Sequence, residues 1–408
     1  SYQYVICMYG TVIAGAVAVP LNLGKDWDAI SYELGLTEPV CILQDGEFAE
    51  REPALAETYG SILKPMDVFA AYEPAEDVTE VEDLSALAFI MFTSSKGVML
   101  SQKNLFSAMP AFLDPFDDVK KYMGWNTDEF SSLSALPMFH ISAMTSLVSW
   151  SITGHSINLC NNLKYFYRDL GAMHSEVMAV VPVLLKSIYS DVMKGRRDRL
   201  NGLCVLTCGA AMFDPKILSD MMEKGFFVAQ MYGLTETCGD GAWNSSQEAK
   251  YLTSVGHVDL SCEYKLDDGE LCMRGDPIML GYYKDPEGTA EVIDADGWFH
   301  TGDIARVEED GYMYLTGRKK NVIILDSGEN VNPEELEKLL VPCADIQECI
   351  VKEKNKKICA LIYCDPAKQE TVKEFVTGVN RGLPLYKRMV TEFSAQPLPR
   401  NAMGKLLR

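Results

Sequence analysis

The sequence has no apolar run long enough to cross a bilayer as a helix. Hydrophobic residues make up 48% of its 408 residues, but none of their runs reaches the roughly 18 uninterrupted residues that a span needs. The most apolar early segment, residues 12–23, is interrupted by Gly15 and Pro20 and predicts a buried strand with its turn. The sequence opens at Ser1 without an initiator Met or a secretory n-region. We therefore expect no membrane span, and we expect that further residues precede Ser1.

Paired cysteines and clustered histidines are also missing. The twelve cysteines are scattered singly. Cys204 and Cys208 stand four apart, but no second pair or His cluster has a zinc-like spacing. Scattered cysteines with apolar neighbours favour a reducing compartment, in which the thiols serve as small core residues. The pattern predicts a cytoplasmic protein.

Basic charge is scarce, since 37 Lys and Arg face 58 Asp and Glu and the net charge is −21. This balance argues against non-specific binding to nucleic acid. The charge is uneven: residues 318–408 carry 16 basic and 12 acidic side chains, a net of +4, and the remainder has a net of −25. A basic C-terminal domain would suit a lid that approaches phosphates, although an uneven solvated surface explains the charges equally well.

What the sequence does contain is the alternation of an α/β protein. Its length predicts two or more domains. Up to about residue 250, short apolar strands alternate with helical segments, as in a parallel sheet. The expected strands at 203–207 and 227–232 each lead into a glycine-containing turn, and in such sheets ligands bind beyond the carboxyl ends of the strands.

The C-terminal part has a different pattern. Turns at 267–269, 294–297 and 309–311 separate short strands and predict a small β subdomain over about 254–316. A helix that begins near Pro333 belongs to a compact α+β unit. We therefore predict an N-terminal body, residues 1–317, made of parallel-sheet α/β subdomains and the β subdomain, followed by a mobile C-terminal lid domain, residues 318–408.

Four segments carry residue types suited to phosphate and nucleoside chemistry. Residues 92–101 follow an apolar strand at 87–91 and offer hydroxyls, a lysine and a glycine, which can wrap a pyrophosphate. Residues 232–237 place an aromatic face, two hydroxyls and the Glu236 carboxylate after another strand, and Glu236 could ligate Mg²⁺. Asp303, in residues 297–305, could accept both ribose hydroxyls, and Lys405 follows a flexible glycine in residues 399–408. Taken singly, residues 92–101 are better explained by a surface turn, residues 232–237 equally well by a helix cap, and Lys405 by an ordinary solvated lysine.

Together and in this order, these segments resemble the adenylate-forming superfamily of acyl-CoA synthetases, peptide-synthetase adenylation domains and luciferases. The resemblance runs essentially from end to end. It also includes residues 15–22, 136–140, 281–283, 301–303, 317–321 and 404–405.

The resemblance implies a role for each matching residue. The phosphate-binding loop would comprise Thr93, Ser94, Ser95 and Lys96. The nucleotide pocket would include Gly209, Ala210, Ala211, Tyr232 and Gly233, with Tyr232 over the adenine. Thr235 would contact the α-phosphate, Glu236 would bind Mg²⁺, and Asp303 and Arg318 would hold the ribose. His140 would lie near the acyl carboxylate, Lys320 would be the hinge, and Lys405 would bridge carboxylate and α-phosphate during adenylation.

Two departures from the superfamily bear on this interpretation. The superfamily usually carries an additional segment before the position of Ser1. Its phosphate loop also has a Gly-Thr-Thr-Gly-like insert where this chain passes directly from Ser95 to Lys96. Either the loop core is lost, which should cripple adenylation, or the sequence omits a segment, and we expect the second.

The sequence predicts an acid–thiol ligase that uses ATP, Mg²⁺ and coenzyme A, with a fatty or aryl acid as substrate. Residues 139–144 offer no carboxylate to pair with an α-ammonium group, which disfavours amino acids. Met138, Met144, Met212 and Met231 would suit an adaptable apolar acyl site, although the alternative is that they and His140 are core residues. Two alternatives are an adenylation enzyme that loads the phosphopantetheine of an acyl carrier protein and a non-catalytic nucleotide-binding protein.

Overall fold

The chain forms two compact units in a computed structural model. The structure describes residues 2–45, 50, 52–71, 82–93, 96–113, 116–125, 129–160, 162–209, 213–258, 261–325, 329–400 and 406–407. The first unit comprises Ser1–Tyr264 and Met273–Phe299, and the second comprises Lys265–Cys272 and His300–Arg408. The boundary after Gly317 and the mobile lid remain predictions.

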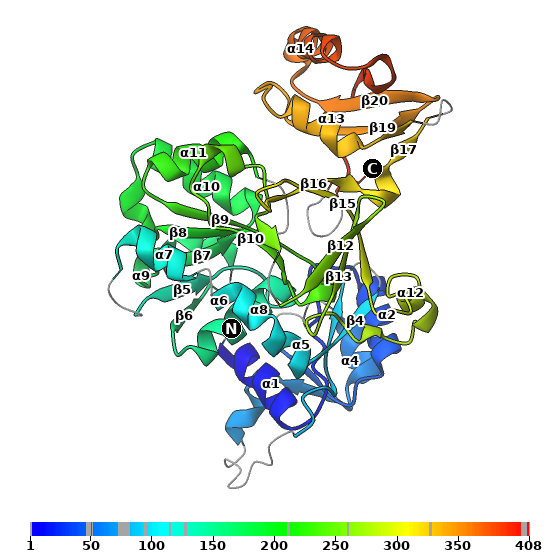
Figure 1. The fold of residues 1–408 in the computed structure, drawn as a ribbon. Helices are drawn as coiled ribbons and strands as arrows, with labels where there is room; N and C mark the ends of the chain where they lie inside the picture. Colours follow the sequence, from blue (N-terminus) through cyan, green and yellow to red (C-terminus); the bar gives the residue numbers. More distant parts are fainter. Residues whose placement is uncertain are drawn as a thin grey trace. The chain divides into compact units, whose positions relative to one another are not determined.

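A seven-stranded sheet in the order β11-β10-β9-β8-β7-β5-β6 is the centre of the first unit (Figure 1). Its strands are β5 (Ser131–Ser134), β6 (Ser156–Leu159), β7 (Val177–Val180), β8 (Val205–Cys208), β9 (Phe227–Gly233), β10 (Gly241–Asn244) and β11 (His257–Val258). The five strands from β9 to β6 are parallel, whereas β10 and β11 are antiparallel additions at one edge. The sheet therefore confirms the predicted α/β class and the strands expected at 203–207 and 227–232.

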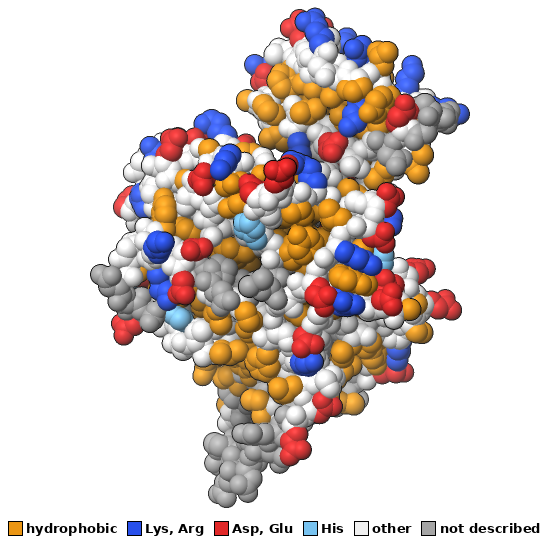
Figure 2. All heavy atoms as spheres, in the orientation of Figure 1, with side chains coloured by type: hydrophobic (Ala, Val, Ile, Leu, Met, Phe, Trp, Pro, Cys, Tyr) orange, Lys and Arg blue, Asp and Glu red, His pale blue; other side chains and the backbone are white. Residues whose placement is uncertain are grey.

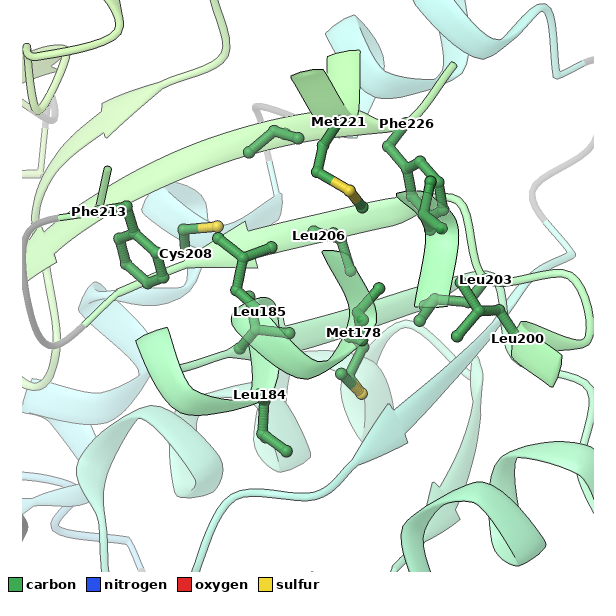
Figure 3. Close-up of a cluster of buried hydrophobic side chains, with 14 of the residues drawn as sticks. Met178, Leu184, Leu185, Leu200, Leu203, Leu206, Cys208, Phe213, Met221 and Phe226 are labelled. Carbon is green, nitrogen blue, oxygen red and sulfur yellow. The ribbon is translucent and has the colours of Figure 1, made fainter. Parts of the chain in front are cut away.

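Helices cover both faces of this sheet because successive strand residues point to opposite sides. One core contains Met178, Leu206 and Val228, packed against α10 (Pro182–Met193) and α11 (Pro215–Glu223). Figure 3 shows Met178 and Leu206 of this core with Leu185 of α10 and Met221 of α11. The other contains Val177, Val205 and Phe227, packed against α7 (Phe116–Met123) and α8 (Ile141–Ile152). Strands that are buried on both faces consist of continuous apolar residues. These strands could therefore be predicted from the sequence.

Two smaller sheets complete the first unit. One has the order β14-β4-β3, formed by β3 (Leu87–Phe92), β4 (Gly97–Ser101) and β14 (Gly281–Tyr282), and the other pairs β1 (Ile42–Gln44) with β2 (Leu63–Pro65). The remaining helices are α1 (Tyr2–Ile13), α2 (Trp27–Thr37), α4 (Pro53–Tyr59), α5 (Gln102–Ser107), α6 (Met109–Leu113), α9 (Phe166–Ala172) and α12 (Pro286–Ala290).

The strand predicted within residues 12–23 is wrong. Helix α1 runs through Val12 to Ile13, and Gly15 then adopts a φ of 72°, which breaks the helix. Beyond it, Ala18 makes only an isolated parallel bridge to Phe89. The apolar run was misread because it joins the end of a helix to an extended segment.

The second unit is built around β structure with two helices. Most of a sheet in the order β12-β13-β15-β16 lies here, formed by β12 (Glu263–Asp267), β13 (Glu270–Arg274), β15 (Phe299–Val307) and β16 (Met313–Arg318). Beyond it follow β17 (Ile323–Ile324), β18 (Asn330–Val331), α13 (Pro333–Leu340), β19 (Glu348–Lys354), β20 (Lys357–Tyr363), α14 (Gln369–Arg381) and β21 (Val390–Phe393). The helix at Pro333 and the hairpin turn at 267–269 are as predicted.

Charged side chains of both signs are visible on the surface (Figure 2). Acidic side chains occur on both units of the face drawn in Figure 2. All twelve cysteines are free thiols. None of the helices within the described residues has the length and apolarity of a membrane span.

Candidate active site

The predicted phosphate loop connects two antiparallel strands, β3 and β4. The Thr93 amide donates to the Lys96 carbonyl at 3.1 Å and closes the base of this hairpin. Ser94 and Ser95 lie outside the described residues. Lys96 extends to Asp285, with 3.5 Å between Nζ and Oδ2, and its Nζ lies 4.3 Å from the centroid of the Tyr282 ring. A lysine over an aromatic face is held by the negative potential of the ring.

Tyr282 connects this lysine to the predicted magnesium ligand. Its backbone pairs with Val98 on β4, and its hydroxyl donates to Glu236 Oε1 at 3.0 Å. Burial and the nearby Glu236 charge raise the pKa of Tyr282, so the phenol remains a protonated donor at neutral pH. The Glu236 backbone is also fixed, because its carbonyl accepts from the Met279 amide at 2.8 Å. Lys96 and Glu236, predicted independently from two motifs, therefore both contact the same tyrosine.

The turn after β9 holds the next predicted residues. Tyr232 is buried in the strand, and Thr235 and Glu236 belong to a single 3-10 turn, Thr235–Thr237. The turn requires glycine at position 233, because a Cβ there would stand 2.0 Å from the Gly239 carbonyl oxygen. A residue with a side chain could not make so close an approach between the two backbone segments.

The carboxyl ends of neighbouring parallel strands bring other predicted residues to the same edge of the sheet. Gly209 follows β8, and the position of its missing Cβ is 3.8 Å from the Met231 carbonyl oxygen on β9. His140 follows β5 and occupies the N-cap position of α8, where burial lowers the pKa of its imidazole. His140 is therefore neutral at physiological pH. Ala210 and Ala211 lie outside the described residues.

In the second unit, the two predicted ribose residues form an ion pair. Asp303 on β15 stands opposite Arg318 on β16, and Arg318 Nε lies 2.6 Å from Asp303 Oδ1. The Asp303 side chain is buried, and its amide donates to Thr301 Oγ1 at 3.1 Å. Lys320 is exposed in the turn Lys319–Asn321, and Lys405 lies outside the described residues.

A buried carboxylate next to this ion pair was not predicted. Glu270 accepts hydrogen bonds from the Gly302 amide at 3.0 Å, His300 Nδ1 at 3.1 Å and Lys319 Nζ at 2.7 Å. Burial favours its neutral form, but the hydrogen bonds from Lys319 and His300 outweigh burial and lower the pKa of Glu270. These bonds fix the start of β15 immediately before Asp303, so Glu270 is a positioning residue.

The sequence motifs did not predict that Glu270 and Asp285 belong to the candidate site, or that Tyr282 contacts Glu236. Tyr282 falls in a recognisable segment, but its contact with Glu236 depends on the pairing of β14 with β4. Glu270 follows the Asp268-Gly269 turn, and only the register of a β sheet places it opposite His300 and Gly302.

Two places in the described part of the chain offer side-chain ligand atoms for a metal ion. The Glu236 carboxylate offers oxygen ligands, which fit Mg²⁺. Asp267, Cys272 and His300 bring potential ligand atoms within 4.8 Å of one another. Sulfur and imidazole suit softer ions, so this second cluster does not fit Mg²⁺.

A family model of AMP-binding enzymes matches residues 1–283. The chain belongs to this family. The match spans every predicted site residue of the first unit and confirms the resemblance to the adenylate-forming superfamily.

Curated relatives of this AMP-binding enzyme are CoA ligases. The long-chain-fatty-acid–CoA ligase FadD13 of Mycobacterium tuberculosis is 27% identical over 444 residues, which cover 100% of this chain and 85% of that protein. The 2-succinylbenzoate–CoA ligase of Bacillus licheniformis is 28% identical over 435 residues, covering 100% and 86%.

Solved structures share the fold. The o-succinylbenzoate CoA synthetase of Bacillus subtilis, bound to the acyl-adenylate intermediate OSB-AMP, has a TM-score of 0.80 at 24% identity and covers 100% of this chain and 85% of that one. ATP-bound MatB of Rhodopseudomonas palustris has a TM-score of 0.82 at 22% identity, with coverage of 100% and 85%. At these identities the structures establish the fold.

Proposed function

We propose that this AMP-binding enzyme joins a carboxylic acid to coenzyme A at the expense of ATP. In the first step, a carboxylate oxygen attacks the α-phosphorus of ATP, the bond to the β-phosphate oxygen breaks, and pyrophosphate leaves. In the second step, the thiol sulfur attacks the acyl carbon, AMP leaves, and the thiol proton passes to water. The observation that carries the proposal is the convergence of Lys96, Tyr282 and Glu236 in a chain of this family.

The first step brings two anions together, so catalysis depends on charge and position. Lys96 lies 4.3 Å from the Tyr282 ring and can present its ammonium to the departing phosphates. Glu236 would hold Mg²⁺, which when bound neutralises phosphate charge. Tyr282 limits the freedom of Glu236 by its 3.0 Å hydrogen bond.

The remaining roles follow the family pattern. We assign the phosphate loop to Thr93, Ser94, Ser95 and Lys96, the adenine site to Gly209, Ala210, Ala211, Tyr232 and Gly233, the α-phosphate to Thr235, the ribose to Asp303 and Arg318, the hinge to Lys320, and the bridging lysine to Lys405. The ion pair between Asp303 and Arg318 supports their joint role, because one partner fixes the other. His140 would lie near the acyl carboxylate, and a neutral imidazole there can share a hydrogen bond with it.

We assign the substrate to the fatty and aryl acids. Segment 139–144 has no carboxylate to pair with an amino acid's ammonium group, and the relatives are named for a fatty acid and for 2-succinylbenzoate. The twelve free thiols support a reducing compartment such as the cytoplasm.

The first step is tested by acid-dependent exchange of labelled pyrophosphate into ATP, across fatty, aryl and amino acids. Exchange with one acid class, lost in Glu236→Gln and Lys405→Ala, is the expected result. Absence of exchange with every acid, in protein shown to be folded, would contradict the proposal.

The acyl acceptor needs a separate assay. Release of AMP that depends on coenzyme A, with the thioester identified by mass, would support the CoA ligase. Turnover only with a phosphopantetheinylated acyl carrier protein would instead support the carrier-loading alternative.

A further inference from the structure

Three side chains with metal-binding atoms, far apart in the sequence, come together in the second unit. Asp267 ends β12, Cys272 lies within β13 and His300 lies near the start of β15. These three strands are neighbours in one sheet (Figure 1). One ligand atom from each residue lies within 4.8 Å of the other two. The cluster belongs wholly to one compact unit, and none of its members has a part in the proposed acid activation.

Strand pairing explains why these side chains share one face of the sheet. The turn between β12 and β13 is Asp268-Gly269, and both residues have a positive φ, of 49° and 79°. Two-residue hairpin turns of this kind place the flanking residues, Asp267 and Glu270, directly opposite each other. Cys272 is two positions beyond Glu270, and alternate strand residues point to the same side. The backbone therefore directs all three side chains toward one face.

His300 approaches this face from the neighbouring strand. Its Nδ1 lies 3.4 Å from Cys272 Sγ and 3.1 Å from Glu270 Oε2. The Glu270 carboxylate is also held by Lys319 Nζ at 2.7 Å and by the Gly302 amide at 3.0 Å. Because these two partners keep Glu270 satisfied, the imidazole nitrogen can bind an ion without leaving a buried carboxylate unpaired.

The separations agree with the bond lengths of a small ion. Zinc binds sulfur at about 2.3 Å and imidazole nitrogen at about 2.0–2.1 Å, so the two atoms stand roughly 3.5 Å apart in a tetrahedral site. Cys272 Sγ and His300 Nδ1 are 3.4 Å apart. A thiol–imidazole hydrogen bond has a similar length, and an ion would take the place of its proton. Asp267 is exposed, so its carboxylate has room to adjust and become the third ligand.

The charges around the cluster allow a divalent cation to bind. Burial and the nearby Glu270 charge raise the pKa of Cys272 to about 11, so its thiol is protonated at neutral pH. A bound ion would displace this proton to water, because a thiol that coordinates a metal is deprotonated. Lys265 and Lys319 also lie close to the thiol. The thiolate and the Asp267 carboxylate would then balance the two positive charges of the ion.

We propose that Asp267, Cys272 and His300 form a binding site for a borderline-soft divalent ion of the Zn²⁺ class. Thiolate and imidazole favour such an ion over Mg²⁺ or Ca²⁺, which prefer oxygen. Three protein ligands leave the fourth position of a tetrahedral site to water. Since the ion would join three strands of one sheet, its binding should also raise the thermal midpoint of the second unit.

Cobalt(II) spectroscopy of the full chain tests the inference, because Co²⁺ enters zinc sites and is coloured. The enzyme is freed of metal with a chelator, kept reduced and titrated with Co²⁺. We expect one ion per chain, the visible bands of tetrahedral Co²⁺ and a sulfur-to-cobalt charge-transfer band in the near ultraviolet. Zn²⁺ should abolish these bands, whereas excess Mg²⁺ should not. Competition with a chromophoric chelator should give a Kd for Zn²⁺ of about 1 μM or lower.

Variants assign the bands to the proposed ligands. Cys272→Ser should abolish the charge-transfer band. His300→Gln and Asp267→Asn should each weaken Zn²⁺ binding by at least about tenfold, the smallest loss seen when even an outer partner of a metal ligand is removed. Cys349→Ser is the matched control, because Cys349 is a half-buried free thiol on β19 of the same unit and lies outside the cluster. It should leave the spectrum and the Kd unchanged.

The outcomes decide between this site and other thiols. Absence of the charge-transfer band in the wild type would overturn the inference, as would a band that survives both Cys272→Ser and His300→Gln or is lost in Cys349→Ser. Cys272 is buried, so thermal unfolding shows whether its variant is folded; if it is not, the wild-type spectrum and His300→Gln decide. Pyrophosphate exchange is a separate assay, so failure of acid activation would leave the metal site standing.

Discussion

The hydroxyl of Tyr282 should control the response of the enzyme to Mg²⁺. Tyr282→Phe removes only the donor that lies 3.0 Å from Glu236 Oε1. The aromatic ring beneath Lys96 and the backbone pairing with Val98 should remain. The variant therefore isolates the restraint on the predicted magnesium ligand.

The size of the effect follows from the charge of the acceptor. A hydrogen bond to a charged group contributes about 1.5–3 kcal/mol. Because Glu236 is only half-buried, we take the lower end, which corresponds to roughly a tenfold change. Losses of this order are typical when the outer partner of a metal ligand is removed.

The assay is pyrophosphate exchange over a Mg²⁺ titration at fixed ATP. We expect the Mg²⁺ concentration at half-maximal rate to rise about tenfold in Tyr282→Phe, with little change in rate at saturating Mg²⁺. Tyr283→Phe, one residue further along and half-buried, serves as the control. An unchanged midpoint in Tyr282→Phe, or an equal shift in Tyr283→Phe, would refute this reasoning.

Three further perturbations test the site and its supports. Arg318→Gln should lower the free energy of unfolding in urea by about 2 kcal/mol. This loss is smaller than that for a fully buried ion pair, because the Arg318 side chain is one-third exposed. The KM for ATP should also rise in this variant. Burial raises the pKa of Glu270, but hydrogen bonds to its carboxylate outweigh burial and lower the pKa. Glu270→Gln should therefore be less stable than wild type above about pH 4.3, the pKa of an unfolded glutamate. In urea unfolding, this difference in stability should disappear as the pH falls through the pKa of the folded protein. Gly233→Ala should lower the thermal midpoint sharply because its Cβ would lie 2.0 Å from a carbonyl oxygen, whereas Gly35→Ala, with open space in α2, should be neutral or stabilise by up to about 1 kcal/mol.

Much of the fold could be predicted because its strands are buried on both faces. Continuous apolar runs ending at glycine marked β8 and β9, and Pro333 marked the start of α13. The prediction failed at residues 12–23, where the periodicity of one element runs into the next without a polar break. The hydropathy of residues 12–23 indicates burial but does not distinguish a helix from an extended segment. The change from one to the other occurs at Gly15, through its positive φ.

The candidate site could be predicted in part, for a different reason. Phosphate chemistry demands particular residue types at short spacing, so Lys96, Glu236 and Asp303 stand in recognisable segments. The contacts that support these residues could not be predicted, since Tyr282 and Glu270 reach their partners through strand register, which a single sequence does not display.

The same division explains why the motifs predict adenylation better than they predict the acid. Every substrate of such an enzyme presents the same carboxylate and the same triphosphate, so the groups that handle them must occur in fixed segments. The tail differs between acids, so the side chains that contact it are not fixed by the chemistry that all the acids share. The shared chemistry of the reaction therefore predicts the adenylation step, and the panel of fatty, aryl and amino acids in the pyrophosphate exchange assay is needed to identify the tail.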